Sequence, residues 1–173
     1  GEQSGEVVAT APVLVPNSPP TSPASVTLTP ASVTVQGELS CLYEATSIDP
    51  DADPIEYLLV WVVNGYENAS DGDSTVAVSA LNSALGTPAS KGDSVLCRVQ
   101  ASDGALASES IDSSVVVISN SAPNGGWVGM SPSSPTVETP VLCQAFGATD
   151  PDLDPVDWTY EWLVNDAPVE GAS

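Results

Sequence analysis

One acidic motif in this sequence returns almost unchanged about one hundred residues later. Asp-Pro-Asp-Ala-Asp-Pro at positions 49–54 recurs as Asp-Pro-Asp-Leu-Asp-Pro at 150–155, and Trp-Val-Val-Asn at 61–64 recurs as Trp-Leu-Val-Asn at 162–165. Cys41 and Cys143 keep the same order and nearly the same spacing. Matches that preserve order and spacing over about fifty residues indicate a tandem array, with a unit the size of one small β domain.

The repeat also predicts where each unit begins. Asn-Ser-Pro-Pro at 17–20 returns as Asn-Ser-Ala-Pro at 120–123, which marks the start of a unit twice. We therefore expect residues 1–16 to be the last strand of a preceding unit, 17–119 to be a complete unit, and 120–173 to be the front half of the next. On this interpretation the chain is a piece of a longer array.

Within the complete unit, short β-rich runs alternate with Gly, Pro, Asp and Ser, and no long stretch has helical periodicity. This pattern predicts an all-β sandwich. The expected strands are 25–35, 39–44, 57–63, 75–81, 94–101 and 115–118. In the strand 57–63 and its repeat, one row of side chains is expected to face the core, and it includes Tyr57, Leu59, Trp61 and Trp162.

The charge of the chain excludes several classes of function. There are 23 acidic residues, two basic residues and no histidine, which gives a net charge of −21. A protein without a basic patch has nothing to bind nucleic-acid phosphates, and a protein without histidine has no imidazole base. No nucleophile–base pair can be named, so we do not expect an enzyme. No apolar run reaches the length needed to cross a bilayer, so we expect no membrane insertion in this segment.

The order of cysteines and tryptophan resembles that of immunoglobulin-like domains. Cys41 falls on the second expected strand and Cys97 on the sixth, with Trp61 between them. The segments 92–97 and 101–104 and the acidic loop before Trp61 are similar to tandem Ig-like, cadherin-like and PKD-related repeats of prokaryotic surface proteins. The resemblance implies tandem immunoglobulin-like Greek-key β-sandwiches of about 100 residues.

The resemblance also implies a disulfide between Cys41 and Cys97 that joins the two sheets and packs on Trp61. Such a bond indicates an extracellular or cell-surface location. Cys143 corresponds to Cys41, so its partner is expected near position 199, beyond this sequence; the alternative is a free or intermolecular thiol. For Cys41 and Cys97 the alternative is a pair of buried reduced thiols.

Two acidic loops, 49–54 and 150–155, each carry three aspartates at alternate positions. Oxygen ligands of this kind suit calcium. The first loop is not an EF-hand, because Pro54 and Val60 occupy the positions of the required Gly and Glu. Sandwich topology brings Asp103 to the same end of the unit, beside the linker 17–20 that joins the preceding unit. In the cadherin-like relatives, calcium at such junctions stiffens the rod. The predicted calcium ligands are Asp49, Asp51, Asp53, Asp103, Asp150, Asp152 and Asp154. The alternative is a solvated turn in which aspartates cap backbone N–H groups.

One outward row of the central strand is apolar in the complete unit: Leu58, Val60 and Val62. The corresponding residues of the next unit are Thr159, Glu161 and Leu163, so the fold does not require an apolar row there. Exposed apolar rows often mark contacts, which predicts lateral association with another protein. The alternative is that the preceding stretch or the loop 67–74 folds over the row.

The expected function is therefore structural or adhesive: a segment of a stalk, fibre or adhesin shaft whose partners are the neighbouring repeats, with calcium stiffening the junctions. A first alternative is a spacer or carbohydrate-binding module of a secreted hydrolase, which requires an exposed aromatic platform. Trp127 is the candidate for it, because the other tryptophans fall on inward rows. A second alternative is a filament subunit with strand exchange between chains, although residues 1–16 supply only one of the missing strands.

Overall fold

The computed structural model describes residues 10–68 and 72–169, and these residues form an all-β fold with one short 3₁₀ turn, as predicted. The repeat defines two segments, called here the first unit (17–119) and the second unit (120–173). The first unit holds β1 (Val26–Thr29), β2 (Glu38–Tyr43), β3 (Glu56–Val63), β4 (Tyr66–Asn68), β5 (Thr75–Ala77), η1 (Val78–Ala80), β6 (Ser94–Ser102), β7 (Ile111–Asp112) and β8 (Val116–Val117). The second holds β9 (Asn124–Ser131), β10 (Leu142–Thr149), β11 (Leu163–Val164) and β12 (Ala167–Pro168).

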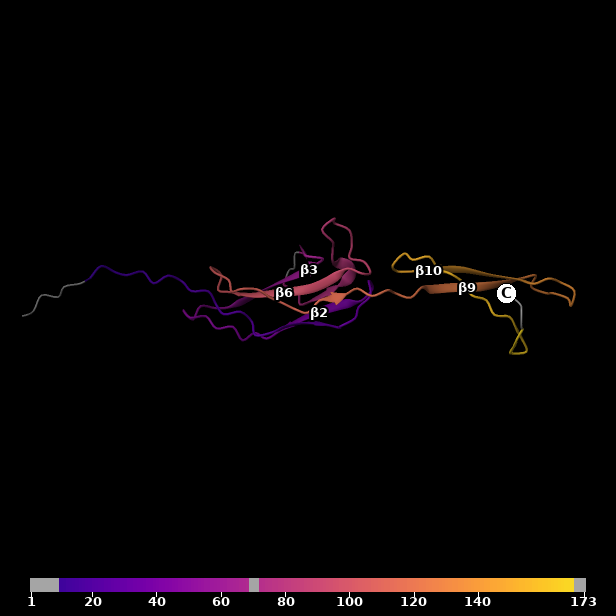
Figure 1. The fold of residues 1–173 in the computed structure, drawn as a ribbon, viewed down its shortest axis with the longest axis horizontal. Helices are drawn as coiled ribbons and strands as arrows, with labels where there is room; N and C mark the ends of the chain where they lie inside the picture. The colour runs from indigo at the N-terminus through magenta and orange to yellow at the C-terminus, as the bar shows by residue number, and fades with distance from the viewer. Residues whose placement is uncertain (1–9, 69–71, 170–173) are drawn as a thin grey trace, which may run out of the picture.

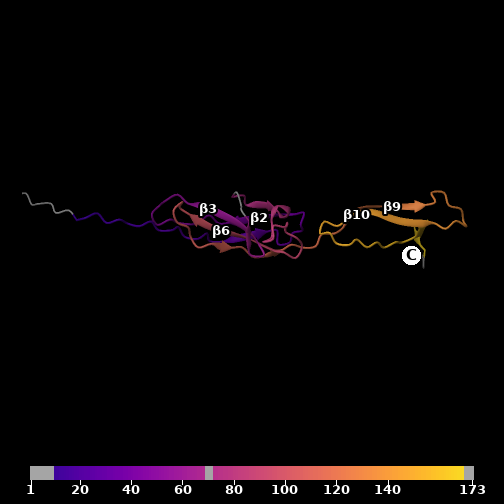
Figure 2. The same ribbon diagram turned by 90° about the horizontal axis from the view of Figure 1, so that it is seen from above.

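The strands of the first unit form two antiparallel sheets that enclose one core. One sheet has the order β1-β2-β5, and the other has the order β4-β3-β6-β7, with β8 also paired to β6. Figures 1 and 2 show these layers in the middle of an elongated molecule, with the β9–β10 hairpin beyond them along the long axis. The predicted β-sandwich is thus present in this unit as two facing sheets.

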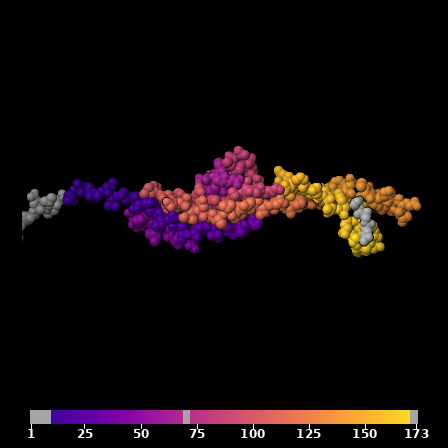
Figure 3. Space-filling view, in the orientation of Figure 1, coloured from indigo at the N-terminus to yellow at the C-terminus, as the bar shows by residue number. Residues whose placement is uncertain are grey.

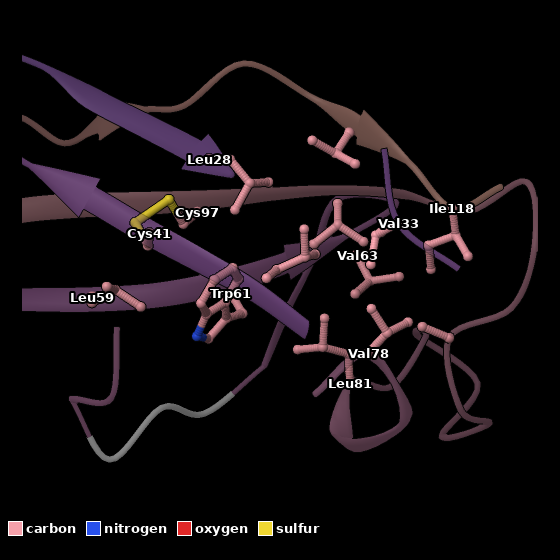
Figure 4. Packing of buried hydrophobic residues seen from close by; sticks show 14 of the residues in the cluster. Leu28, Val33, Cys41, Leu59, Trp61, Val63, Val78, Leu81, Cys97 and Ile118 are labelled. Atoms are coloured by element: carbon pink, nitrogen blue, oxygen red, sulfur yellow. A yellow bond between two sulfur atoms is a disulfide. The ribbon is translucent and has the colours of Figure 1, made fainter. Parts of the chain in front are cut away.

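Alternation along β3 and β6 builds the core between the sheets. Val95, Cys97, Val99 and Ala101 are buried on β6, whereas the residues between them are partly exposed. Branched and aromatic side chains favour such half-buried strands. Figure 4 shows the resulting cluster around Trp61, which is almost fully buried.

A disulfide joins the sheets through this core. It links Cys41 on β2 to Cys97 on β6 and closes a sequence separation of 56 residues, which confirms the predicted pairing. Trp61 lies directly opposite Cys97 on the neighbouring strand. Leu59 is buried, whereas Tyr57 is partly buried and packs against Tyr43, with ring centroids 5.1 Å apart.

Several strand boundaries differ from the sequence prediction. The strand expected over 25–35 ends at Thr29, because Pro30 has no N–H to continue the ladder; beyond it, Val33 makes one isolated parallel bridge with Ile118. The strand expected over 75–81 ends at Ala77, where η1 begins. The short strands β4 and β7 were not predicted, since two or three residues carry no measurable periodicity.

The outward row of β3 is not the continuous exposed apolar strip that the sequence suggested. Leu58 is 46% exposed, but Val62 is only 4% exposed, so the prediction is wrong at Val62. Arg98 lies opposite Val60 and binds Glu67 on β4 and Asp112 on β7. These ion pairs span the outer face and interrupt the apolar row. The hydrogen bond to Asp112, and to a smaller extent the one to Glu67, raises the pKa of Arg98 above its ordinary value.

The hairpin of the second unit reproduces β1 and β2. Cys143 lies opposite Met130 in the ladder, as Cys41 lies opposite Leu28 in the first unit. Cys143 is partly exposed and forms no disulfide within the described residues. Trp162, the counterpart of Trp61, lines a small pocket beside Cys143 and is only partly buried, so it is not enclosed in a core as expected.

Candidate functional site: the acidic loops and the linkers

The first acidic loop is held in shape by its own leading aspartate. The Asp49 carboxylate accepts hydrogen bonds from the backbone N–H groups of Asp51 at 2.8 Å and Asp53 at 3.2 Å. The N–H of Ala52 bonds to the Asp49 carbonyl, and Ala52 has a φ of 64°. Asp49 is buried, so its side chain serves as an internal cap of the turn.

The second acidic loop repeats this geometry residue by residue. Asp150 accepts from the N–H groups of Asp152 at 2.8 Å and Asp154 at 3.3 Å. Leu153 takes the same left-handed conformation as Ala52, again with a φ of 64°. The sequence repeat is therefore a structural repeat at this site, and the aspartates act as caps, as the alternative interpretation of the loops proposed.

The middle aspartate of each loop binds the linker that enters its unit. Asp51 accepts a hydrogen bond from the N–H of Ser18 at 2.7 Å, and Asp152 accepts one from the N–H of Ser121. In the first unit Asp103 also accepts from the side chain of Asn17 at 2.8 Å. The aspartates 51 and 103 thus meet at the linker, where sandwich topology had placed them.

Hydrogen bonds also shift the titration of Asp103. The N–H groups of Leu106 and then Ala105 lower the pKa of Asp103. They donate to the same carboxylate oxygen, which the turn after β6 encloses. Asp103 is therefore ionised at neutral pH while it contacts the linker.

Lys91 connects the two units. Its ammonium group, on the first unit, pairs with Asp154 of the second acidic loop and donates to the side chain of Asn120 at 3.0 Å. The pKa of Lys91 is raised, chiefly by the hydrogen bond to Asp154; desolvation opposes this increase, and the charges of Asp154, Asp152 and Asp150 add to it. Figure 1 shows the loop at the end of β10 that faces the first unit.

Sequence reasoning did not identify this role of Lys91. The pairing partner lies 63 residues away, in another unit, so no local pattern reveals it. The small number of basic residues was a signal that each of them forms an ion pair. The sequence has only one lysine and one arginine, and both Lys91 and Arg98 form ion pairs.

The two loops differ in how close their carboxylates lie. Oxygen atoms of Asp150, Asp152 and Asp154 lie within 4.8 Å of one another, and among the described residues this is the one group with such spacing. Asp53 is exposed, and the first loop does not form an equally tight cluster. Two buried carboxylate oxygens, Asp49 Oδ2 and Asp152 Oδ1, have no hydrogen-bond partner in the described part of the chain.

No family model matches the chain, and neither does any curated protein or solved structure. In the part of the chain that the structure describes, no helix is long and apolar enough to cross a membrane.

Proposed function

We propose that this chain is a structural or adhesive segment of a long extracellular repeat protein, in which Ig-like sandwiches are joined end to end. The strand order supports the Ig-like assignment: β1, β2 and β5 face a sheet centred on β3 and β6. The bond between β2 and β6, with Trp61 beside it, supports it as well. A disulfide of this kind is expected in an oxidising compartment, at the surface of a prokaryotic cell or outside it.

The observation that carries the proposal is the junction contact that occurs twice. In both units the middle aspartate of the acidic loop binds the backbone of the entering linker, at Ser18 and at Ser121. A charged acceptor strengthens such a hydrogen bond. A linker tied to the unit that it enters has less freedom to bend, which is the property a shaft needs.

Lys91 adds a contact from the other side of the junction. Its bond to Asp154 ties the end of the first unit to the acidic loop of the second, across the linker. The ammonium also offsets part of the repulsion among three close carboxylates. The neighbouring repeats are thus the partners of each unit in this proposal.

Amide hydrogen exchange tests the junction contact directly. In Asp51→Ala we expect exchange at the N–H of Ser18 to rise by about tenfold or more, because a hydrogen bond to a charged group is lost. Exchange at Ser121 should stay as it was. Asp152→Ala is the matched variant and should show the reverse pattern; equal exchange at both serines in all three proteins would refute the contact.

Calcium is the second element of the proposal, at the loop of Asp150, Asp152 and Asp154. These residues offer only oxygen ligands, which calcium prefers, and the unpartnered oxygen of Asp152 fits a cation. A bound calcium ion would supply charge neutralisation, which Lys91 supplies in part from the chain itself.

Thermal unfolding with calcium and then with excess EGTA tests this element. We expect calcium to raise the midpoint by several degrees, since a ligand that binds only the folded state stabilises it. The increase should be smaller in Asp154→Asn. An unchanged midpoint in calcium would limit the loops to capping and leave the hydrogen bonds to the linkers as the source of stiffness.

A further inference from the structure

Two aromatic rings lie stacked and exposed on the hairpin of the second unit. Trp127 on β9 and Phe146 on β10 are direct cross-strand partners, with ring centroids 4.5 Å apart and an interplanar angle of 27°. Trp127 is 61% exposed although it is one of the largest apolar side chains. Phe146 stacks on the indole, and the exposed part of the ring is available to a ligand.

The repeat shows that these rings belong to the outer face of the sheet and not to an unfinished core. The ladder aligns Met130 and Cys143 with Leu28 and Cys41, which are buried in the first unit. The same alignment places Trp127 and Phe146 at the positions of Ser25 and Glu44. The N–H of Glu44 bonds to the carbonyl of Ser25, and the Glu44 side chain is exposed.

Two sheets that enclose a core, as in the first unit, leave this outer face open. In the first unit the whole core has formed, and Thr27, Leu42 and Glu44 on the same face are still exposed. The aromatic pair is a feature that the second unit has and the first unit lacks. A binding role for this pair would be additional to the shaft function. Its test does not depend on the junction contacts.

The surroundings of the pair select for an uncharged ligand. The strands β9 and β10 contain no charged residue, in a chain of net charge −21. That net charge repels polyanions, and both basic residues are held in ion pairs elsewhere. The two strands also carry no carboxylate that would pair with a cationic group of a ligand.

Small and amide-bearing residues complete the surface. A Cβ atom at Gly129 would lie 3.3 Å from the indole of Trp127, and one at Gly147 would lie 3.4 Å from it, so these glycines leave room for the flat ring. Gln144 lies opposite Gly129 and is exposed. Its amide group can both donate to and accept from hydroxyl groups.

We propose that Trp127 and Phe146 form a platform that binds the pyranose rings of a neutral polysaccharide. The negative face of an aromatic ring attracts the C–H groups on the flat face of a sugar, and amide groups nearby bind its hydroxyls. A shaft unit with this platform would hold a neutral glycan along its side.

Affinity gel electrophoresis of the 173-residue chain tests the platform, with xyloglucan, galactomannan and hydroxyethylcellulose as probes and pull-down on cellulose and chitin. The double variant Trp127→Ser/Phe146→Glu carries the residues that the first unit has at these positions. We expect binding to at least one probe, weakened by about tenfold or more in the double variant, as for the loss of a hot-spot aromatic. Leu85→Ala, at an exposed apolar residue of the first unit, is the control and should bind normally.

A transfer of the platform keeps the test independent of any folding defect. Addition of Ser25→Trp and Glu44→Phe to the double variant places the aromatic pair on the first unit. Binding to the same probe should then be restored. The proposal is overturned if the unaltered chain binds none of the probes, or if the double variant binds as well as the unaltered chain. It is also overturned if sedimentation shows that the pair only mediates self-association of the chain.

Discussion

Replacement of Cys41 and Cys97 by alanine is expected to lower the free energy of unfolding of the first unit by about 4 kcal/mol. The bond closes a loop with a sequence separation of 56 residues, and cross-linking a loop of that length removes much of the entropy of the unfolded chain. Both sulfur atoms lie in the core, so the double alanine variant also loses packing. Urea denaturation followed by tryptophan fluorescence measures the change.

Cys143→Ala is the matched control for this experiment. Its side chain is partly exposed and unpaired within the described residues, so the substitution should leave the midpoint of the first unit unchanged. Addition of a reducing agent to the unaltered chain should reproduce most of the loss. A double alanine variant as stable as the unaltered chain would show that the bond adds no stability to the sandwich.

The second large effect is expected at Trp61, where Trp61→Ala should cost about 3–5 kcal/mol. The side chain is 2% exposed and lies between the two sheets, directly opposite Cys97. Its indole N–H also donates to the carbonyl of Asp73 at 3.4 Å. Removal of the ring leaves a cavity that two sheets joined by a disulfide can close only in part.

Trp162→Ala is the comparison that separates burial from residue type. Trp162 occupies the equivalent place in the second unit but is only partly buried, so the cost should be less than half of that at Trp61. The free-energy costs of Trp61→Ala and of the double cysteine variant should not be additive, because the residues are neighbours. Equal costs at Trp61 and Trp162 would contradict the difference in packing between the units.

The sequence predicted the elements that repeat or alternate. The tandem motif predicts units of nearly constant spacing, which stays a prediction. The inward row of β3 was correct for Leu59 and Trp61, because alternation along a long strand is a strong signal. The disulfide was predicted through the resemblance to immunoglobulin-like domains, and the structure confirms it.

Features that depend on contacts between distant strands could not be predicted in the same way. Val62 is buried and lies opposite Glu67, which pairs with Arg98, whereas Leu58 on the same outer row is exposed. The outward placement of Phe146 follows only from the observed register of β9 and β10.

The acidic loops show the same limit at the candidate site. Their carboxylate spacing fits a metal site and a set of backbone caps equally well when only the sequence is known. The structure adds the hydrogen bonds of Asp49 and Asp150 to their own loops, and the bond of Lys91 to Asp154. Lys91 supplies from another unit a positive charge that the loop sequence alone does not contain.

In the proposed shaft, the contacts at Ser121 and Lys91 hold the two units in one orientation. Pulsed electron spin resonance measures this directly, with nitroxide labels on cysteines that replace Leu85 and Val137. Both side chains are exposed, one in each unit, and Figure 3 shows the units one after the other along the long axis of the molecule. Cys143→Ser removes the remaining free thiol from the labelling reaction.

We expect a narrow distance distribution in EGTA, and a clearly broader one when Lys91→Ala and Asp152→Ala are combined. The two substitutions remove the ion pair and the cap on the linker while the disulfide-bonded sandwich remains intact. Calcium should leave the unaltered junction narrow. A distribution that is already broad with the native junction, in EGTA and in calcium alike, would show that the units turn freely and would contradict the proposed shaft.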